Sequence, residues 1–65
     1  MPVPGQFYVH GKTGRVYKVI EVGTFKGEGA LDSSPIVIYT PQSESGTPWY
    51  ARPLDEFTQK FTRLS

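Results

Sequence analysis

The fold of this chain is decided by the stretch Arg15-Val16-Tyr17-Lys18-Val19-Ile20-Glu21-Val22, which is its strongest β-strand pattern. Most of these residues are β-branched or aromatic, the types that are enriched in strands. Side chains alternate along a regular strand, so one face carries Val16, Ile20 and Val22, and the other carries Tyr17 and Val19. A strand that is partly apolar on both faces indicates a sheet that bends around a small barrel.

Shorter elements are predicted on both sides of this stretch. Residues 6–10 are rich in aromatic and β-branched types, and the two glycines in residues 11–14 predict a turn into the central strand. Further strands are predicted at residues 36–40, 49–52 and 61–64. A single helical turn is predicted at residues 53–57, because proline is favoured at a helix start and acidic residues near it.

The segments between these elements contain turn-forming residues. Residues 1–5 include two prolines and a glycine and predict an extended lead-in. Residues 23–35 predict a long loop, and the polar residues 41–48 predict a reversal of the chain.

We therefore expect a single all-β domain over residues 1–65. Five short strands with one helical turn before the last strand are typical of a small SH3-like barrel. An open five-stranded sheet or an OB-like barrel is the alternative. The two best strands and the helical turn should supply the buried core, with Val16, Ile20, Val37, Leu54 and Phe57 as its members.

The composition limits what the chain can be. A domain of 65 residues has a thin core, and the chain has no cysteine and only one histidine, so a disulfide scaffold is excluded and a metal site is not expected. It has no apolar run of about 18 residues, which a membrane span needs, and no signal-peptide pattern. We expect a cytoplasmic protein without membrane contact. The net charge of +1 argues against strong nucleic-acid binding.

No residue pattern predicts catalysis or a cofactor. Gly11-Lys12-Thr13 lacks the upstream glycine spacing of a phosphate-binding loop, and strand residues fill the gap. His10 has no recognisable nucleophile and orienting group to act with. Asp55 and Glu56 are adjacent on a helical turn, so their carboxylates point in different directions. We expect a chain that is not an enzyme and that holds no cofactor or metal.

The candidate binding residues are aromatic and basic side chains near the two ends of the chain: Tyr8, His10, Lys12, Arg15, Tyr17, Trp49, Tyr50 and Arg52. Such residues stack on bases or line grooves for proline-rich peptides, but large aromatics also form the core of a small barrel. We expect Trp49 and Tyr39 to be core residues. Arg52 and His10 favour a structural bracket between the two ends, and Lys12 favours a binding patch because it lies in a turn.

The same segments resemble a family of short, uncharacterised bacterial and bacteriophage proteins with a domain of unknown function. The family pattern has a Tyr-x-His-x-Lys start, a Tyr-x-Val strand, a Val-x-Tyr strand and a Trp-x-Arg-Pro-x-x-x-Phe ending. The matching residues are Tyr8, His10, Lys12, Gly14, Tyr17, Val19, Val37, Tyr39, Trp49, Arg52, Pro53, Phe57 and Phe61. One departure is that two residues, instead of one, lie between Trp49 and Arg52. The resemblance implies a phage or prophage origin and a location in the host cytoplasm, and it implies no activity.

Two classes of function remain open from the sequence. The first is a binding module that docks on a host or phage protein, which the near-neutral charge and the missing catalytic set favour. The alternative is a barrel that binds single-stranded nucleic acid with an affinity that falls steeply with salt. Its binding residues would be Tyr8, Tyr17, Lys12, Arg15 and Arg52.

Overall fold

The computed structural model describes residues 2–27, 34–43 and 48–64. They form a five-stranded antiparallel sheet whose strands are β1 (Phe7–His10), β2 (Val16–Phe25), β3 (Ser34–Pro41), β4 (Tyr50–Pro53) and β5 (Phe61–Arg63). A short helix, α1 (Leu54–Lys60), connects β4 to β5. The predicted all-β sheet with a helical segment before its last strand is therefore confirmed, although α1 is longer than the single turn expected.

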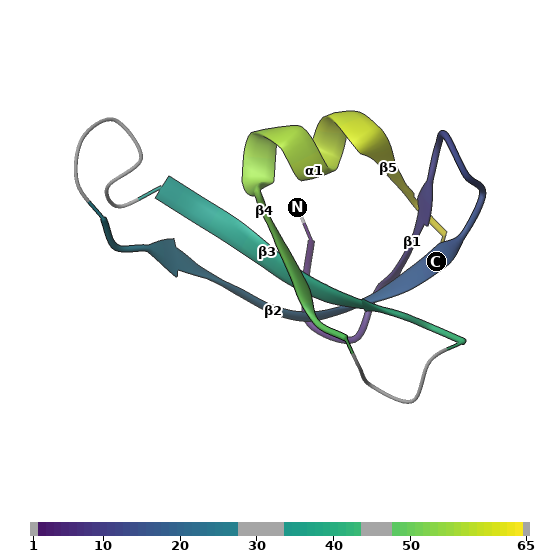
Figure 1. The fold of residues 1–65 in the computed structure, drawn as a ribbon, viewed down its shortest axis with the longest axis horizontal. Helices are drawn as coiled ribbons and strands as arrows, with labels where there is room; N and C mark the ends of the chain where they lie inside the picture. Colours follow the sequence, from purple (N-terminus) through teal and green to yellow (C-terminus); the bar gives the residue numbers. More distant parts are fainter. Residues whose placement is uncertain (1, 28–33, 44–47, 65) are drawn as a thin grey trace.

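The strand order across the sheet is β4-β3-β2-β1-β5. The curved sheet has β4 and β5 as its edges, and α1 lies across one face between them (Figure 1). Among the described residues no pairing joins β4 to β5, so the sheet is open. The last strand returns to the first, because β5 pairs with β1.

Local sequence explains the first hairpin and the helix. Gly14 has a φ of 75°, which glycine adopts at little steric cost, and its N–H donates to the carbonyl of His10 at 2.7 Å. In α1, Asp55 and Glu56 lie in the first turn and Lys60 in the last, so their charges complement the helix dipole.

A β-bulge in β2 changes which residues face the core. Val19 pairs with Tyr39, but the next pair is Glu21 with Ile38, so Ile20 is the extra residue. Alternation places Val19 on the core face before the bulge, and the extra residue places Val22 on the same face after it. The expected face with Val16, Ile20 and Val22 was therefore wrong.

The core is mainly aromatic. Its buried members are Tyr8, Val19, Val37, Tyr39, Phe57 and Phe61. Burial is thus confirmed for Val37 and Phe57, whereas Val16, Ile20 and Leu54 are only half-buried. Tyr39 is a core residue as expected, but Trp49 is 60% exposed, because it precedes β4 at the open edge of the sheet.

The predicted loop at residues 23–35 is shorter than expected. β2 continues to Phe25 and β3 begins at Ser34, because Gly23, Thr24 and Phe25 pair with Ile36, Pro35 and Ser34. The centre of this loop, residues 28–33, lies outside the described residues, as do residues 44–47 of the predicted reversal.

Candidate binding site

The candidate site is an open pocket of about 200 Å³, which we call the tyrosine pocket; it is lined by His10, Thr13, Tyr17, Tyr39, Tyr50, Arg52 and Phe61. The register of the strands brings the lining residues of this pocket together. His10 pairs with Phe61 across β1 and β5, and Tyr39 pairs with Tyr50 across β3 and β4. Cross-strand partners lie on the same face of a sheet, so side chains from distant segments meet here.

Phe61 lies at the centre of the aromatic packing. Its ring centroid is 4.8 Å from that of His10, 5.5 Å from Tyr17 and 5.1 Å from Tyr39, each at a steep interplanar angle. Such edge-to-face contacts stabilise aromatic pairs beyond the area they bury. The inner wall of the pocket is therefore part of the core and is held in one arrangement.

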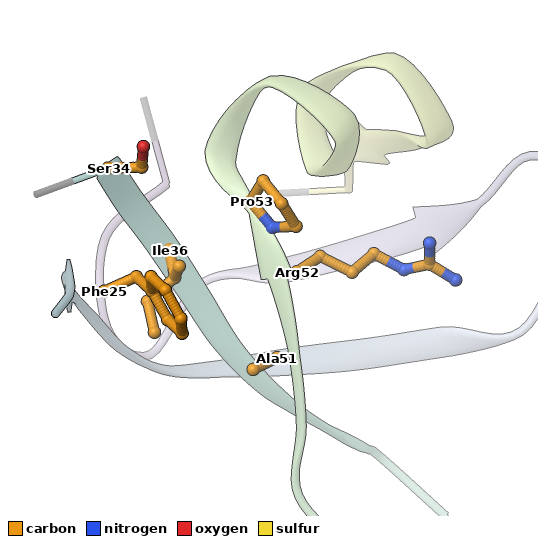
Figure 2. Close-up of a pocket in the computed structure, with 6 residues that line it drawn as sticks. All are labelled: Phe25, Ser34, Ile36, Ala51, Arg52 and Pro53. Carbon is orange, nitrogen blue, oxygen red and sulfur yellow. The ribbon is translucent and has the colours of Figure 1, made fainter. Parts of the chain in front are cut away.

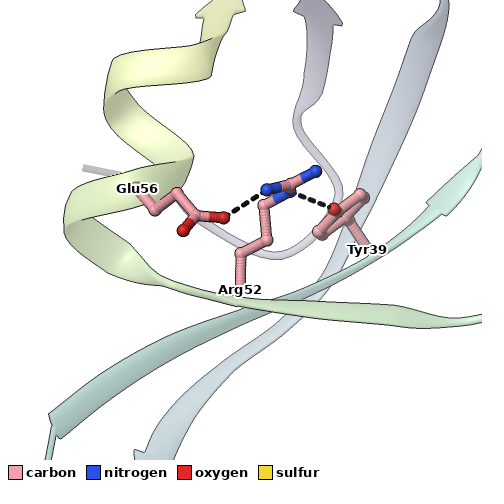
Figure 3. A network of polar contacts seen from close by, with 3 residues as sticks. All are labelled: Tyr39, Arg52 and Glu56. Carbon is pink, nitrogen blue, oxygen red and sulfur yellow. Dashed lines mark hydrogen bonds and ion pairs between the residues drawn. The ribbon is translucent and has the colours of Figure 1, made fainter.

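Arg52 connects three elements at the side of the pocket (Figure 3). Its Nε donates to the Tyr39 hydroxyl at 2.7 Å, and its Nη1 forms an ion pair with Glu56 of α1. The guanidinium carbon lies 5.8 Å from the centre of the Phe61 ring, within cation–π range. Arg52 therefore ties β4 to β3, α1 and β5.

Burial and hydrogen bonding shift the pKa values of this pair. Burial raises the pKa of Tyr39 above its ordinary value near 10 and outweighs the opposing effect of the Arg52 hydrogen bond. The hydrogen bond to Tyr39 raises the pKa of Arg52. At neutral pH the pair is thus a neutral phenol that accepts from a guanidinium cation.

The remaining polar groups of the pocket include several that can donate a hydrogen bond. The backbone N–H of Thr13 donates to His10 Nδ1 at 3.3 Å, and the Thr13 hydroxyl lies at the same distance from this nitrogen. Within the described part of the chain, no hydrogen bond is formed by Arg52 Nη2, by His10 Nε2 or by the hydroxyls of Tyr17 and Tyr50. The pocket therefore offers hydrogen-bond donors to a ligand.

The structure brings together four of the eight residues that the sequence singled out, namely His10, Tyr17, Tyr50 and Arg52. Tyr8 is buried in the core instead, with its ring 5.1 Å from Phe57. Lys12 and Arg15 are exposed in the first hairpin and do not line the pocket, and neither does exposed Trp49.

Sequence reasoning missed Thr13 and Phe61 as pocket residues, and it placed Tyr39 only in the core. The sequence places Phe61 in the last predicted strand, and the structure shows that its ring also lines the pocket. The sequence feature that bears on Phe61 is the helical segment before the last strand. After this helix the chain returns to β1, where Phe61 pairs with His10.

A second hollow lies near β4 (Figure 2). This groove of about 270 Å³ is almost wholly apolar and is lined by Phe25, Ser34, Ile36, Ala51, Arg52 and Pro53. The guanidinium of Arg52 points away from the other labelled residues in Figure 2, so the aliphatic part of this side chain is the part that lines the groove. The groove has few groups that would select a ligand.

Residues 2–27, 34–43 and 48–64 contain no cluster of three or more side chains suited to holding a metal ion. They also contain no helix that is long and apolar enough to cross a membrane.

Comparisons with protein-family models, with curated proteins and with solved structures find no match to this chain.

Proposed function

We propose that the chain is a small non-enzymatic binding module, encoded by a phage or prophage, that docks on a host or phage protein in the host cytoplasm. The observation that carries this proposal is the tyrosine pocket. Four candidate residues from three separate strands, His10, Tyr17, Tyr50 and Arg52, share one open hollow with donor groups and aromatic walls. A concave site of this kind with a few convergent polar groups is suited to recognition.

An SH3-like barrel is part of this proposal. The order β4-β3-β2-β1-β5, with a short helix between the fourth and fifth strands, supports it. The bulge in β2 also supports it, because bulges increase the local bend and twist of a sheet.

The distribution of charge favours a protein partner over single-stranded nucleic acid. Arg52 is already paired with Glu56 of α1. A phosphate group at Arg52 would meet this carboxylate. Nucleic-acid grooves need a basic track along the backbone, whereas the net charge here is +1.

Affinity capture tests the proposal. The chain is immobilised and used to enrich proteins from lysates of several bacterial hosts, and Tyr50→Ala is used in parallel. Tyr50 is 45% exposed, so the variant should stay folded. We expect one or a few proteins that resist a salt wash and are lost with Tyr50→Ala. Recovery of nothing above background from every host would contradict the proposal.

A titration with a single-stranded oligonucleotide distinguishes a protein partner from a nucleic-acid partner, and Trp49 provides one of its signals. Trp49 is 60% exposed beside the pocket residue Tyr50, so its emission reports on docking nearby. Labelled oligothymidylate is titrated at two salt concentrations while anisotropy and Trp49 emission are recorded. The proposal predicts negligible binding at physiological salt, whereas tight binding that weakens steeply with salt would show the alternative, a nucleic-acid-binding barrel.

A further inference from the structure

The tyrosine pocket combines aromatic walls with groups that can donate hydrogen bonds. Its walls are aromatic, and the groups without an acceptor among the described residues are Arg52 Nη2, His10 Nε2 and the hydroxyls of Tyr17 and Tyr50. Arg52 Nη2 can only donate, and the two hydroxyls can donate or accept, so a ligand that carries hydrogen-bond acceptors beside apolar surface matches this pocket. Peptide carbonyls next to apolar side chains supply both.

Charge argues for a neutral acceptor rather than an anion. The positive charge of Arg52 is compensated by its ion pair with Glu56. A carboxylate or phosphate in the pocket would compete with Glu56 for the same guanidinium. A carbonyl oxygen can accept from the unused Nη2 without displacing this ion pair.

The β4 edge of the sheet, which carries Tyr50 and Arg52, is poorly suited to strand addition. β4 is an edge strand of four residues, and Pro53 within it has no N–H. Proline is tolerated in a strand where its nitrogen faces away from the neighbour, so the free edge carries an N–H only at Ala51. Such an edge offers few backbone groups to an added strand. The tyrosine pocket has a volume of about 200 Å³, which suits one or two side chains of a ligand better than the long groove that a helix face occupies.

A polyproline II segment meets these conditions. It has no internal hydrogen bonds, so its carbonyls are free to accept, and its proline rings are flat and apolar. We propose, on the basis of the protein-docking function above, that the tyrosine pocket binds a proline-containing extended segment of the partner. Its carbonyls accept from Arg52 Nη2 and from the hydroxyls of Tyr17 and Tyr50, and a proline ring packs against the two tyrosine rings.

A displayed library of random dodecapeptides tests this inference. The wild-type chain is the bait, and Tyr50→Ala is used for counter-selection. We expect enriched peptides with at least two prolines and little net charge. Enrichment of acidic, basic or proline-free peptides would overturn the inference, and so would the absence of any enrichment.

Titration of the wild-type chain with a capped octaproline peptide tests the contacts directly, with a glycine–serine octapeptide as the matched probe. Tyr17→Phe and Tyr50→Phe keep the rings and remove the donors, so each should weaken binding about two- to tenfold. Trp49→Ala is the control, because Trp49 is exposed but does not line the pocket. Equal loss for Trp49→Ala, no loss for the phenylalanine variants, or equal binding of the two probes would overturn the inference.

Lysate capture distinguishes this inference from the proposed function. A partner that is captured in unchanged amount by Tyr50→Ala, Tyr17→Phe and Tyr50→Phe would leave protein docking intact and exclude the pocket as its peptide site. If no partner is captured and no peptide binds, both the proposed docking function and the inferred peptide site are contradicted.

Discussion

Arg52 serves both the fold and the candidate site. Two of its nitrogens bond to Tyr39 and Glu56, and its guanidinium lies over the Phe61 ring. Its third nitrogen remains available at the pocket. These contacts describe a bracket between strands and helix, and they also hold the guanidinium in one position for a ligand.

Replacing Arg52 tests the bracket. The side chain is 30% exposed, so solvent weakens the ion pair, and the hydrogen bond to Tyr39 supplies most of the effect. We expect Arg52→Ala to lower the free energy of unfolding by about 1–2 kcal/mol, and each kcal/mol corresponds to a fall in Tm of about 4–8 °C. Lys12 is exposed in the hairpin turn, so Lys12→Ala should change the free energy by less than about 0.5 kcal/mol. Thermal melts give the comparison. A large loss of stability for Lys12→Ala and none for Arg52→Ala would show that Lys12, and not Arg52, has the structural role.

Tyr39 makes the stability of the fold sensitive to alkaline pH. Burial raises the pKa of its hydroxyl in the folded chain, so the folded state holds this proton more tightly than the unfolded state does. The contribution is complete below the unfolded pKa of about 10 and is lost as the pH rises from there through the folded pKa.

Chemical denaturation at pH 8 and at several values above pH 10 checks this effect. We expect the free energy of unfolding of the wild-type chain to fall across the alkaline range. Tyr39→Phe lacks the titrating group, so it should be less stable at pH 8 but should lose less on going to high pH. Parallel curves for the two chains would show that Tyr39 is not the group responsible.

At the scale of elements, the bulge in β2 is the feature that most affects the core. The extra residue at Ile20 lets Val19 and Val22 face the same side, so one strand of ten residues contributes to the core on both sides of the bend. A regular strand would have turned Val22 outward.

Paired valine variants check this register. Val19 is 1% exposed, so Val19→Ala should cost about 1–3 kcal/mol because it removes two methyl groups from a packed site. Val16 is half-buried, so Val16→Ala should lower the free energy of unfolding clearly less than Val19→Ala does. Denaturant midpoints of the two variants give the comparison, and a larger loss for Val16→Ala would contradict the bulged register.

Helix α1 contributes Phe57 to the core. Phe57 is fully buried, its ring stacks on Phe61 at 4.3 Å, and it also contacts Tyr8 and Tyr39. Phe57→Ala should cost about 3–5 kcal/mol. A domain of this size has a net stability of about 3–5 kcal/mol, so the variant should be largely unfolded.

Circular dichroism of Phe57→Ala tests the packing of α1, and Phe57→Leu provides a milder variant that should still fold with a lower Tm. A cooperative melt of Phe57→Ala close to that of the wild type would show that α1 does not pack on the sheet in this way.

At the scale of the whole molecule, one small core connects almost every element. Its six buried hydrophobic residues come from β1, β2, β3, α1 and β5, and β4 joins them through Arg52. No described element has a separate core of its own. The chain should therefore unfold in a single transition. Far-ultraviolet circular dichroism and the near-ultraviolet tyrosine signal should give the same midpoint, whereas an earlier loss of either signal would indicate a stable intermediate.

Much of the secondary structure follows from the sequence itself. Strand propensity, the glycines of the first turn and the position of Pro53 place five strands and the helical segment near their observed positions, because these signals depend on neighbouring residues. The same information identified His10, Tyr17, Tyr50 and Arg52 as candidates, since aromatic and cationic side chains carry recognition chemistry wherever they lie.

The tertiary structure decided which of these side chains meet. Trp49 is exposed although it was expected in the core, and the candidate binding residue Tyr8 is buried. Residue type alone does not decide burial, because burial also depends on the order of the strands in the sheet. The face of β2 depends on one extra residue at Ile20, and propensity does not detect a bulge. Arg52 and Tyr39 are 13 residues apart, and His10 reaches Phe61 only after β5 returns to β1. Contacts at such separations depend on pairing register, which forms only when the whole sheet has assembled around its core.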